Sequence, residues 1–185
     1  MTESRTTRPN RSYELLPYDP QWAVRFREYA ERLKPIFGDN CIAIEHIGST
    51  SVPGMVAKPQ IDVLVIVKDL AKVKEVYESM KALGYVCKGD FTKKNEEYFT
   101  LDGSDGHRLV SVHTMQHDNW EAKMYIDFRD FLRSHEEARN RYIAKKLELN
   151  QKFTSQDYNS YDFGKGELIA QLREEARAWA AAENR

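Results

Sequence analysis

A short polar stretch between two apolar runs carries residue types that hold phosphate. Gly48, Ser49 and Thr50 open this stretch, and Lys58 lies near its end. Glycine lets backbone N–H groups approach an anion closely, hydroxyl groups donate further hydrogen bonds, and lysine adds positive charge. The composition therefore suggests a phosphate-binding loop. Considered alone, the loop is equally well interpreted as a polar turn between two buried strands.

The spacing of the glycines excludes one known phosphate-binding motif. A Walker loop has four residues between its two glycines, and a lysine directly follows the second glycine. Here five residues separate Gly48 from Gly54, and Lys58 comes four residues later. The chain is therefore not a P-loop kinase on its own.

Asp62 follows the loop at the start of the second apolar run, where a carboxylate is placed to hold Mg²⁺ or Mn²⁺. Residues 62 and 64 of a strand share one face, so an Asp-x-Asp pair would hold two metal ions for phosphoryl or nucleotidyl transfer. The second position is Leu64, which weakens a two-metal interpretation and leaves a one-metal interpretation open. Glu45 on the preceding run is a candidate second metal ligand, although a solvated strand position is the simpler explanation for it.

Three residues further along the chain are candidates for binding an anionic ligand. His113 lies in a strand-like run, where a hydrogen-bonded structural histidine is the common alternative to an anion donor or metal ligand. Arg129 has the geometry to bind phosphate bidentately, or to form salt bridges on a helix surface. Lys165 begins an apolar stripe, so its stem covers the core or its ammonium points into a cleft.

The periodicity of apolar residues predicts the elements that must position these side chains. Short β-branched runs bounded by turn residues predict strands at 42–47, 61–67, 85–88, 98–101 and 109–114. Apolar residues at three- and four-residue steps predict helices at 20–37, 70–83, from about 118, at 136–151, and in a last helix that carries Lys165. The fold class is therefore α+β, a mixed α/β unit over about 13–116 followed by C-terminal helices over about 118–184.

The composition limits the kinds of partner. The 185 residues carry a net charge of −1 with acids and bases interspersed, so no basic stripe for nucleic acid is evident. Cys41 and Cys87 are far apart and lack metal-binding spacing, and no apolar run has membrane-spanning length. We expect a cytoplasmic protein with a small-molecule partner and no membrane, residues 1–12 forming a disordered arm and residues 13–185 a single domain. The oligomeric state stays open.

The central motif resembles the signature of one known family, GrpB, also called UPF0157. The resemblance lies in Glu-His-Ile-Gly-Ser-Thr-Ser-Val-Pro-Gly at 45–54, followed by Ala-Lys-Pro-Gln-Ile-Asp at 57–62. It continues in Pro-Tyr-Asp-Pro-Gln-Trp at 17–22, Val-His at 112–113, Phe-Arg-Asp-Phe-Leu-Arg at 128–133, and Tyr161 followed by Lys165. The match covers roughly residues 15–179.

This resemblance implies a nucleotidyltransferase-like fold, related to the palm of polymerase-β-type enzymes, with helices packed on a mixed sheet. In that superfamily a Gly-Ser pair binds nucleotide phosphates and an Asp-x-Asp strand carries the metals. Gly48, Ser49 and Asp62 match this pattern, and Leu64 departs from it. Glu96 and Glu97 also stand where the resemblance implies a basic residue. GrpB-like domains occur fused to dephospho-CoA kinases, which implies a coenzyme A-related ligand.

Two hypotheses of different classes follow. The first is a nucleotidyltransferase-fold protein that binds a nucleotide or phosphorylated small molecule and transfers a nucleotidyl group, with Asp62 and Ser49 catalytic. In it, phosphate would contact Gly48, Ser49, Thr50, Lys58, His113, Arg129 and Lys165, and metal would contact Asp62 and Glu45. The second is a noncatalytic accessory module that recognises a phosphorylated metabolite. A structural scaffold is disfavoured because it leaves the clustering of charged residues to chance.

Overall fold

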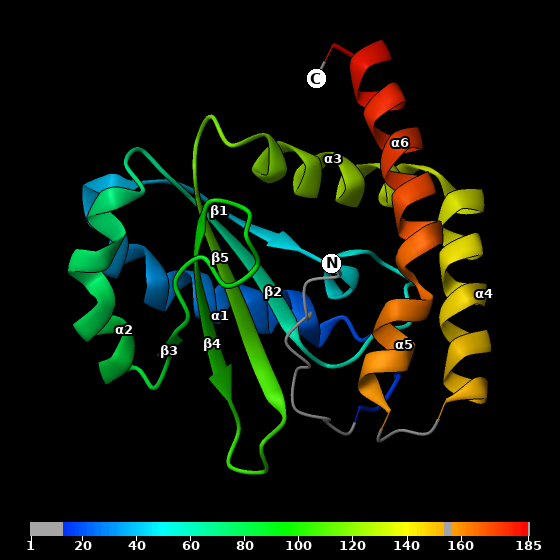
Figure 1. Ribbon diagram of the computed structural model, residues 1–185, viewed down its shortest axis with the longest axis horizontal. Coiled ribbons are helices and arrows are strands. Elements are labelled where there is room, and N and C mark those ends of the chain that lie inside the picture. The colour runs from blue at the N-terminus through cyan, green and yellow to red at the C-terminus, as the bar shows by residue number, and fades with distance from the viewer. Residues whose placement is uncertain (1–12, 154–156, 185) are drawn as a thin grey trace, which may run out of the picture.

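Five strands form one mixed sheet in the order β1-β2-β5-β4-β3 in the computed structural model, which describes residues 13–153 and 157–184 (Figure 1). The strands are β1 (Cys41–Ile47), β2 (Ile61–Val67), β3 (Val86–Cys87), β4 (Glu96–Asp102) and β5 (Arg108–Gln116). β2 pairs antiparallel with β1 and parallel with β5, and the remaining pairs are antiparallel. The loop that joins β1 to β2 therefore leads directly into one of the inner strands.

One face of the sheet is apolar and is covered by the N-terminal helices. These are α1 (Gln21–Phe37), followed by a 3₁₀ turn at Gly38–Asn40, and α2 (Tyr77–Ala82), preceded by a 3₁₀ helix at Ala71–Val76. The alternate residues Val63, Val65 and Val67 of β2 are fully buried in this core. Burial of their apolar surface fixes which face of β2 points inward, so Asp62 and Leu64 must point to the opposite face.

The opposite face is covered at one end by α3 (Trp120–Ser134). Ile47, Leu64 and Met115 of the sheet form a small core with Ala122 of α3. Leu64 is fully buried in this core. The position where an Asp-x-Asp strand would carry its second carboxylate is therefore a packing position beneath α3.

The three C-terminal helices lie beside the β1–β2 loop (Figure 1). They are α4 (Glu136–Lys152), α5 (Tyr158–Gly164) and α6 (Gly166–Ala182). Val52 and Met55 of the loop are buried among residues of α3, α4 and α6. The loop is thus held between the sheet and the C-terminal helices, with a short 3₁₀ turn at Ser49–Ser51.

The predicted α+β architecture with a mixed sheet, packed helices and a C-terminal helical segment is confirmed. All five predicted strands are present, although β4 begins two residues earlier than predicted. The expected helix at 70–83 begins as a 3₁₀ helix. The last predicted helix, which was expected to carry Lys165, begins at Gly166 with Lys165 as its N-cap residue, and the preceding helix α5 was not predicted. Because glycine disfavours helix, Gly164 and Gly166 on either side of Lys165 explain the break between α5 and α6. The arm predicted at 1–12 lies outside the described residues, and none of the described helices is long and apolar enough to cross a membrane.

His46, near the end of β1, packs against α1 and the β1–β2 loop as an uncharged side chain. Its ring stacks on Phe26 of α1 with centroids 4.6 Å apart, and its Nε2 lies 3.1 Å from Thr50 Oγ1. Burial, and to a lesser extent the charges of Arg133 and Arg129, lower the pKa of His46 from 6.5 to about 4. The neutral ring is therefore part of the packing that holds the loop.

We expect this histidine to make folding stability depend on pH. Between pH 6.5 and about 4 the unfolded chain binds a proton that the folded chain resists, so stability present above pH 6.5 is lost as the pH falls. The loss at pH 4.5 is about 2 kcal/mol relative to a chain without the histidine. Denaturant unfolding of wild type and His46→Gln at pH 7 and pH 4.5 measures it.

The exposed His107 supplies the matched control. The His107→Gln variant should keep the wild-type pH dependence, whereas His46→Gln should lack this component. Equal losses of stability in all three proteins would contradict the assignment to His46.

Candidate functional site

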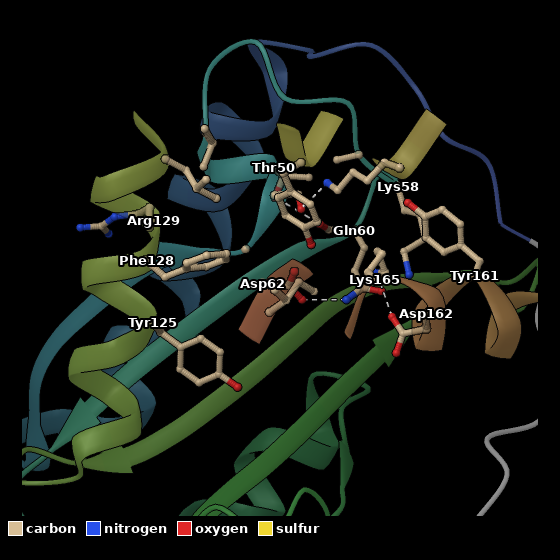
Figure 2. A pocket seen from close by; sticks show the side chains of 18 of the residues that line it. Thr50, Lys58, Gln60, Asp62, Tyr125, Phe128, Arg129, Tyr161, Asp162 and Lys165 are labelled. Atoms are coloured by element: carbon tan, nitrogen blue, oxygen red, sulfur yellow. Dashed lines mark hydrogen bonds and ion pairs between the residues drawn. The ribbon is translucent and has the colours of Figure 1, made fainter. Parts of the chain in front are cut away.

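A cavity of about 360 Å³ lies where the β1–β2 loop, the start of β2, α3 and the C-terminal helices meet. Figure 2 shows Asp62 near its centre, with Tyr125 and Phe128 on one side and Tyr161 and Lys165 on the other. The lining combines aromatic rings, basic side chains and two carboxylates. The sequence-predicted site residues in this lining are Gly48, Ser49, Thr50, Lys58, Asp62, Arg129 and Lys165.

Gly48 and Asp62 approach each other more closely than any other residue at position 48 would allow. Gly48 has a φ of 72°, in the left-handed region that favours glycine. A Cβ atom at Gly48 would lie 2.3 Å from Asp62 Oδ2. The glycine therefore lets the loop backbone pack directly against the carboxylate.

The Asp62 carboxylate is oriented by its neighbours on the sheet. Gln60 Nε2 donates to Asp62 Oδ1 at 2.7 Å and lies 3.2 Å from Ser111 Oγ, while Ser111 Oγ is 2.9 Å from Tyr98 Oη. Burial raises the pKa of Asp62, and the charges of His113 and Lys58 and the Gln60 hydrogen bond act in the other direction. One oxygen is thus occupied by Gln60, and the other faces Gly48.

The loop hydroxyls differ in what they contact. Ser49 Oγ accepts a hydrogen bond from Lys146 Nζ at 2.6 Å. Thr50 is 2% exposed, and its hydroxyl donates to the carbonyl of Gln60 at 3.2 Å. Ser49 therefore belongs to the charged part of the pocket, whereas the Thr50 side chain closes the loop on itself.

Two of the predicted lysines lie over tyrosine rings. Lys58 Nζ is 3.9 Å from the ring centroid of Tyr158, and Lys165 Nζ is 4.7 Å from that of Tyr161. Lys165 also donates to Asp162 at 2.9 Å. Burial pushes the pKa of Lys165 down, but Tyr142 and Asp162 outweigh it, so the pKa lies above its usual value and the ammonium stays charged.

Arg129 borders the cavity, but its guanidinium points away from Asp62 (Figure 2). It donates to Glu45 at 2.6 Å, to Asp130 at 2.8 Å and to the carbonyl of His46 at 3.1 Å. Glu45 does not line the cavity and is one partner of this ion pair. The structure therefore pairs Glu45 with Arg129, outside the residues that line the cavity.

His113 lies on the same sheet face as Asp62 but outside the cavity lining. Its Nδ1 is 2.7 Å from Glu96 Oε2, and Glu96 is fully buried. One of the two glutamates that depart from the family resemblance thus pairs with the histidine. The structure therefore gives His113 a close partner within the sheet and leaves it outside the residues that line the pocket.

Sequence reasoning missed Lys146 of α4, which is 2% exposed and lines the cavity. Its Nζ also donates to the carbonyl of Val56 at 2.8 Å, so one ammonium contacts both ends of the loop. The buried residues Ala138, Tyr142, Lys146 and Leu149 follow at helical steps. A lysine within that apolar stripe was the available signal, because a solvated lysine would lie on the other face. Asp162 and Arg173 were also missed.

The contact between Gly48 and Asp62 leads to a stability prediction. Gly48→Ala should destabilise the fold by about 2–4 kcal/mol, for two reasons. The alanine would have to adopt a left-handed backbone conformation, and its Cβ atom would clash with the Asp62 carboxylate. Denaturant unfolding measures the loss.

Gly106→Ala separates the two causes, because Gly106 has a similar φ of 78° and a Cβ atom added there would have nothing within 4 Å. It should cost about 1 kcal/mol, from the backbone conformation alone. Truncating the carboxylate in the double variant Gly48→Ala/Asp62→Ala should recover part of the larger loss. If the two glycine variants lose the same stability, the Asp62 contact is not the cause.

Comparison with known proteins places this geometry in one family. A family model described as GrpB protein matches residues 12–175. The UPF0157 protein YqkA of Bacillus subtilis is 38% identical over 176 residues, which cover 95% of this chain and 50% of that protein. A dephospho-CoA kinase of Mycolicibacterium paratuberculosis is 30% identical over 75% of this chain and 40% of its own length. The chain thus spans half or less of these two relatives.

A solved structure agrees with the sequence comparison. The crystal structure of the conserved protein GrpB from Enterococcus faecalis is 34% identical, with a TM-score of 0.83. The likeness covers 90% of this chain and 99% of that one. Sequence and structure together show that the chain belongs to the GrpB family.

Proposed function

We propose that this pocket binds a nucleotide or a related phosphorylated small molecule, and that it transfers a nucleotidyl group with the help of a divalent metal. The observation that carries the proposal is the meeting of the Gly48–Thr50 loop, Asp62 and two lysines in one cavity. These groups come from distant parts of the chain. A glycine-bearing loop, ammonium groups and a carboxylate are what a metal-bound phosphate requires.

The phosphate would lie against the loop and the lysines. Ser49 would donate to a phosphate oxygen, and Lys58 and Lys165 would neutralise its charge, because ammonium groups act as point charges towards phosphate. Tyr158 and Tyr161 already lie beneath these ammonium groups. Tyr125 and Phe128 on the opposite side supply apolar surface for the organic part of the ligand.

The residues present fit a metal that is shared with the ligand. Mg²⁺ is usually held by one or two carboxylates together with substrate phosphates and water. Asp62 supplies one carboxylate whose Oδ1 is fixed by Gln60, and the close approach of Gly48 shapes its other side. Among the described residues no group of three or more histidine, cysteine, aspartate or glutamate side chains is placed to hold a metal alone. Asp62 and an oxygen of the bound phosphate would therefore hold the same Mg²⁺ or Mn²⁺ ion.

In nucleotidyl transfer, an acceptor hydroxyl attacks the α-phosphorus of a nucleoside triphosphate and loses its proton to solvent, the bond from the α-phosphorus to the bridging oxygen breaks, and pyrophosphate leaves. A bound divalent ion would supply positive charge beside the reacting phosphate. Asp62 would orient this charge, Ser49 would hold the phosphate in line, and Lys58 and Lys165 would stabilise the negative charge that develops on the leaving group. Most of the catalysis would be electrostatic.

The accessory module is the second candidate, and a specific observation favours it. Leu64 packs beneath α3 where a second carboxylate would be, so a two-metal site lacks one of its ligands. The dephospho-CoA kinase relative supports a coenzyme A-related ligand for such a module. Both candidates use the same pocket. In both we propose a cytoplasmic protein with one domain over residues 13–185.

A thermal-shift titration with nucleoside triphosphates and coenzyme A precursors, with and without Mg²⁺ or Mn²⁺, tests the proposal. A ligand at 100 times its Kd stabilises the folded chain by about 2.7 kcal/mol, which raises the Tm of a domain of this size by roughly 5 °C or more. The metal-dependent part of the shift should disappear in Asp62→Asn, because this variant removes the charge that holds the ion.

Asp39→Asn is the matched control, because Asp39 is exposed and far from the cavity lining. It should keep the full metal-dependent shift. A metal-independent shift that is lost only in Ser49→Ala would support the accessory module. Absence of any shift across the ligand panel would contradict both candidates.

A further inference from the structure

Two helices present the same pair of residues to the pocket. Tyr142 and Lys146 of α4 are four residues apart, as are Tyr161 of α5 and Lys165 just after it. In each pair the ammonium lies over the ring of its own tyrosine, at 4.5 Å for Lys146 and 4.7 Å for Lys165. Both lysines are almost completely buried. The two pairs therefore form similar cationic walls of one cavity.

The two ammonium groups differ in how their charge is balanced. Lys165 donates to the Asp162 carboxylate at 2.9 Å. The contacts described for Lys146 are instead to neutral oxygens, those of Ser49 Oγ at 2.6 Å and the Val56 carbonyl at 2.8 Å. An ammonium that is buried without an opposite charge is costly. The site around Lys146 is therefore short of one negative charge.

The surroundings of Lys146 add to this imbalance. Lys58 and Lys165 line the same cavity, and Arg173 borders it from α6. Burial lowers the pKa of Lys146 well below its usual value, Lys165 and Lys58 lower it further, and Asp62 acts the other way. The phenol of Tyr142 is the remaining titratable group in contact with it. Removing the proton or supplying an anion would each relieve the imbalance.

We propose that Lys146 is the counter-charge for a multiply charged anion in this pocket, and that binding the anion loads Lys146 with a proton. The inference rests on the proposed function and adds a chemical requirement for its ligand. The ligand would carry at least two negative charges near Ser49, as a diphosphate or triphosphate group does. No bond is formed or broken in this step other than the N–H bond made by the proton, which comes from solvent.

The same contact gives Lys146 a positioning role. Its Nζ links Ser49, the first residue of the turn at Ser49–Ser51, to Val56 further along the loop. An anion that draws the ammonium towards itself would therefore also act on the Ser49 hydroxyl. Binding of charge and orientation of Ser49 would be coupled through one side chain.

The pH dependence of pyrophosphate binding to the full chain tests the inference. If binding takes up one proton, the affinity of wild type for pyrophosphate should fall by about tenfold for each pH unit above the pKa of Lys146 in the free protein. This fall adds to the pH dependence that comes from the ionisation of pyrophosphate itself. Lys146→Arg keeps its charge at every pH, so it should show only the slope of pyrophosphate. Calorimetry in two buffers of different ionisation enthalpy should detect proton uptake by wild type that exceeds the uptake by Lys146→Arg.

Lys146→Met and Lys145→Met separate this role from general effects of charge. Lys145 is on the same helix, does not line the cavity and pairs with Glu148. Lys145→Met should behave as wild type. Lys146→Met should bind pyrophosphate at least about tenfold more weakly near neutral pH, because methionine cannot supply the positive charge opposite the anion. The variant should still fold, as circular dichroism would confirm, because an apolar side chain of similar length fills the buried position.

Two results would overturn the inference. If Lys146→Met binds pyrophosphate with wild-type affinity and pH dependence, Lys146 is not the counter-charge, and the proposed function is unaffected. If wild type binds neither pyrophosphate nor any nucleotide in the presence of metal, the inference and the proposed function fail together.

Discussion

The contact between Gly48 and Asp62 is the constraint on which the site depends. The loop backbone at Gly48 approaches the Asp62 carboxylate so closely that even a Cβ atom would be excluded. Because Gly48 follows β1 and Asp62 belongs to β2, this approach sets how the first hairpin of the sheet closes. Val52 and Met55 then anchor the rest of the loop among the helices. The backbone that would meet a phosphate is therefore held by apolar packing and a steric limit together.

The charged groups around this contact lie on two sides of the site, the sheet side and the side of the C-terminal helices. On the sheet, Asp62 is held by Gln60, and where α3 meets β1, Arg129 is neutralised by Glu45 and Asp130. On the side of the C-terminal helices, Lys146 and Lys165 stand over tyrosine rings, which lowers the cost of keeping ammonium groups away from water. The charged groups named on the sheet side are paired, whereas the contacts described for Lys146 on the helix side are to neutral oxygens. An anionic ligand would supply a negative charge on the side of the C-terminal helices.

The sequence predicted the parts of this arrangement that local pattern controls. The β-branched runs before and after the loop predicted β1 and β2, and the alternation of Asp62 and Leu64 predicted that they share a face. The loop residues and Lys165 were predicted to meet a ligand, and they line one cavity. Their roles towards phosphate and metal stay predictions. The partners of Glu45 and His113 could not be predicted, because Arg129 and Glu96 are 84 and 17 residues away and only the fold brings them together.

Lys146 shows why long-range geometry decides chemistry here. In the sequence it stands beside Lys145, and only its place in the apolar stripe of the helix distinguishes it from that neighbour. The helix turns by about 100° per residue, so neighbours on one helix face different surroundings. Lys145 pairs with Glu148 on the surface, whereas Lys146 enters the core and reaches a serine 97 residues away. The same residue type forms a surface ion pair at one position and is buried against neutral oxygens at the next.

The position of Leu64 limits the proposed catalysis. Replacing Leu64 by aspartate would not simply restore a two-carboxylate strand, because the side chain is fully buried between Ile47, Met115 and α3. A carboxylate there would be desolvated beneath an apolar helix, and burial without a partner favours its neutral form. To admit a second metal ligand, α3 would have to lie further from β2. The packing of α3 on the sheet, rather than one substitution, therefore leaves Asp62 as the carboxylate that β2 offers to the proposed site.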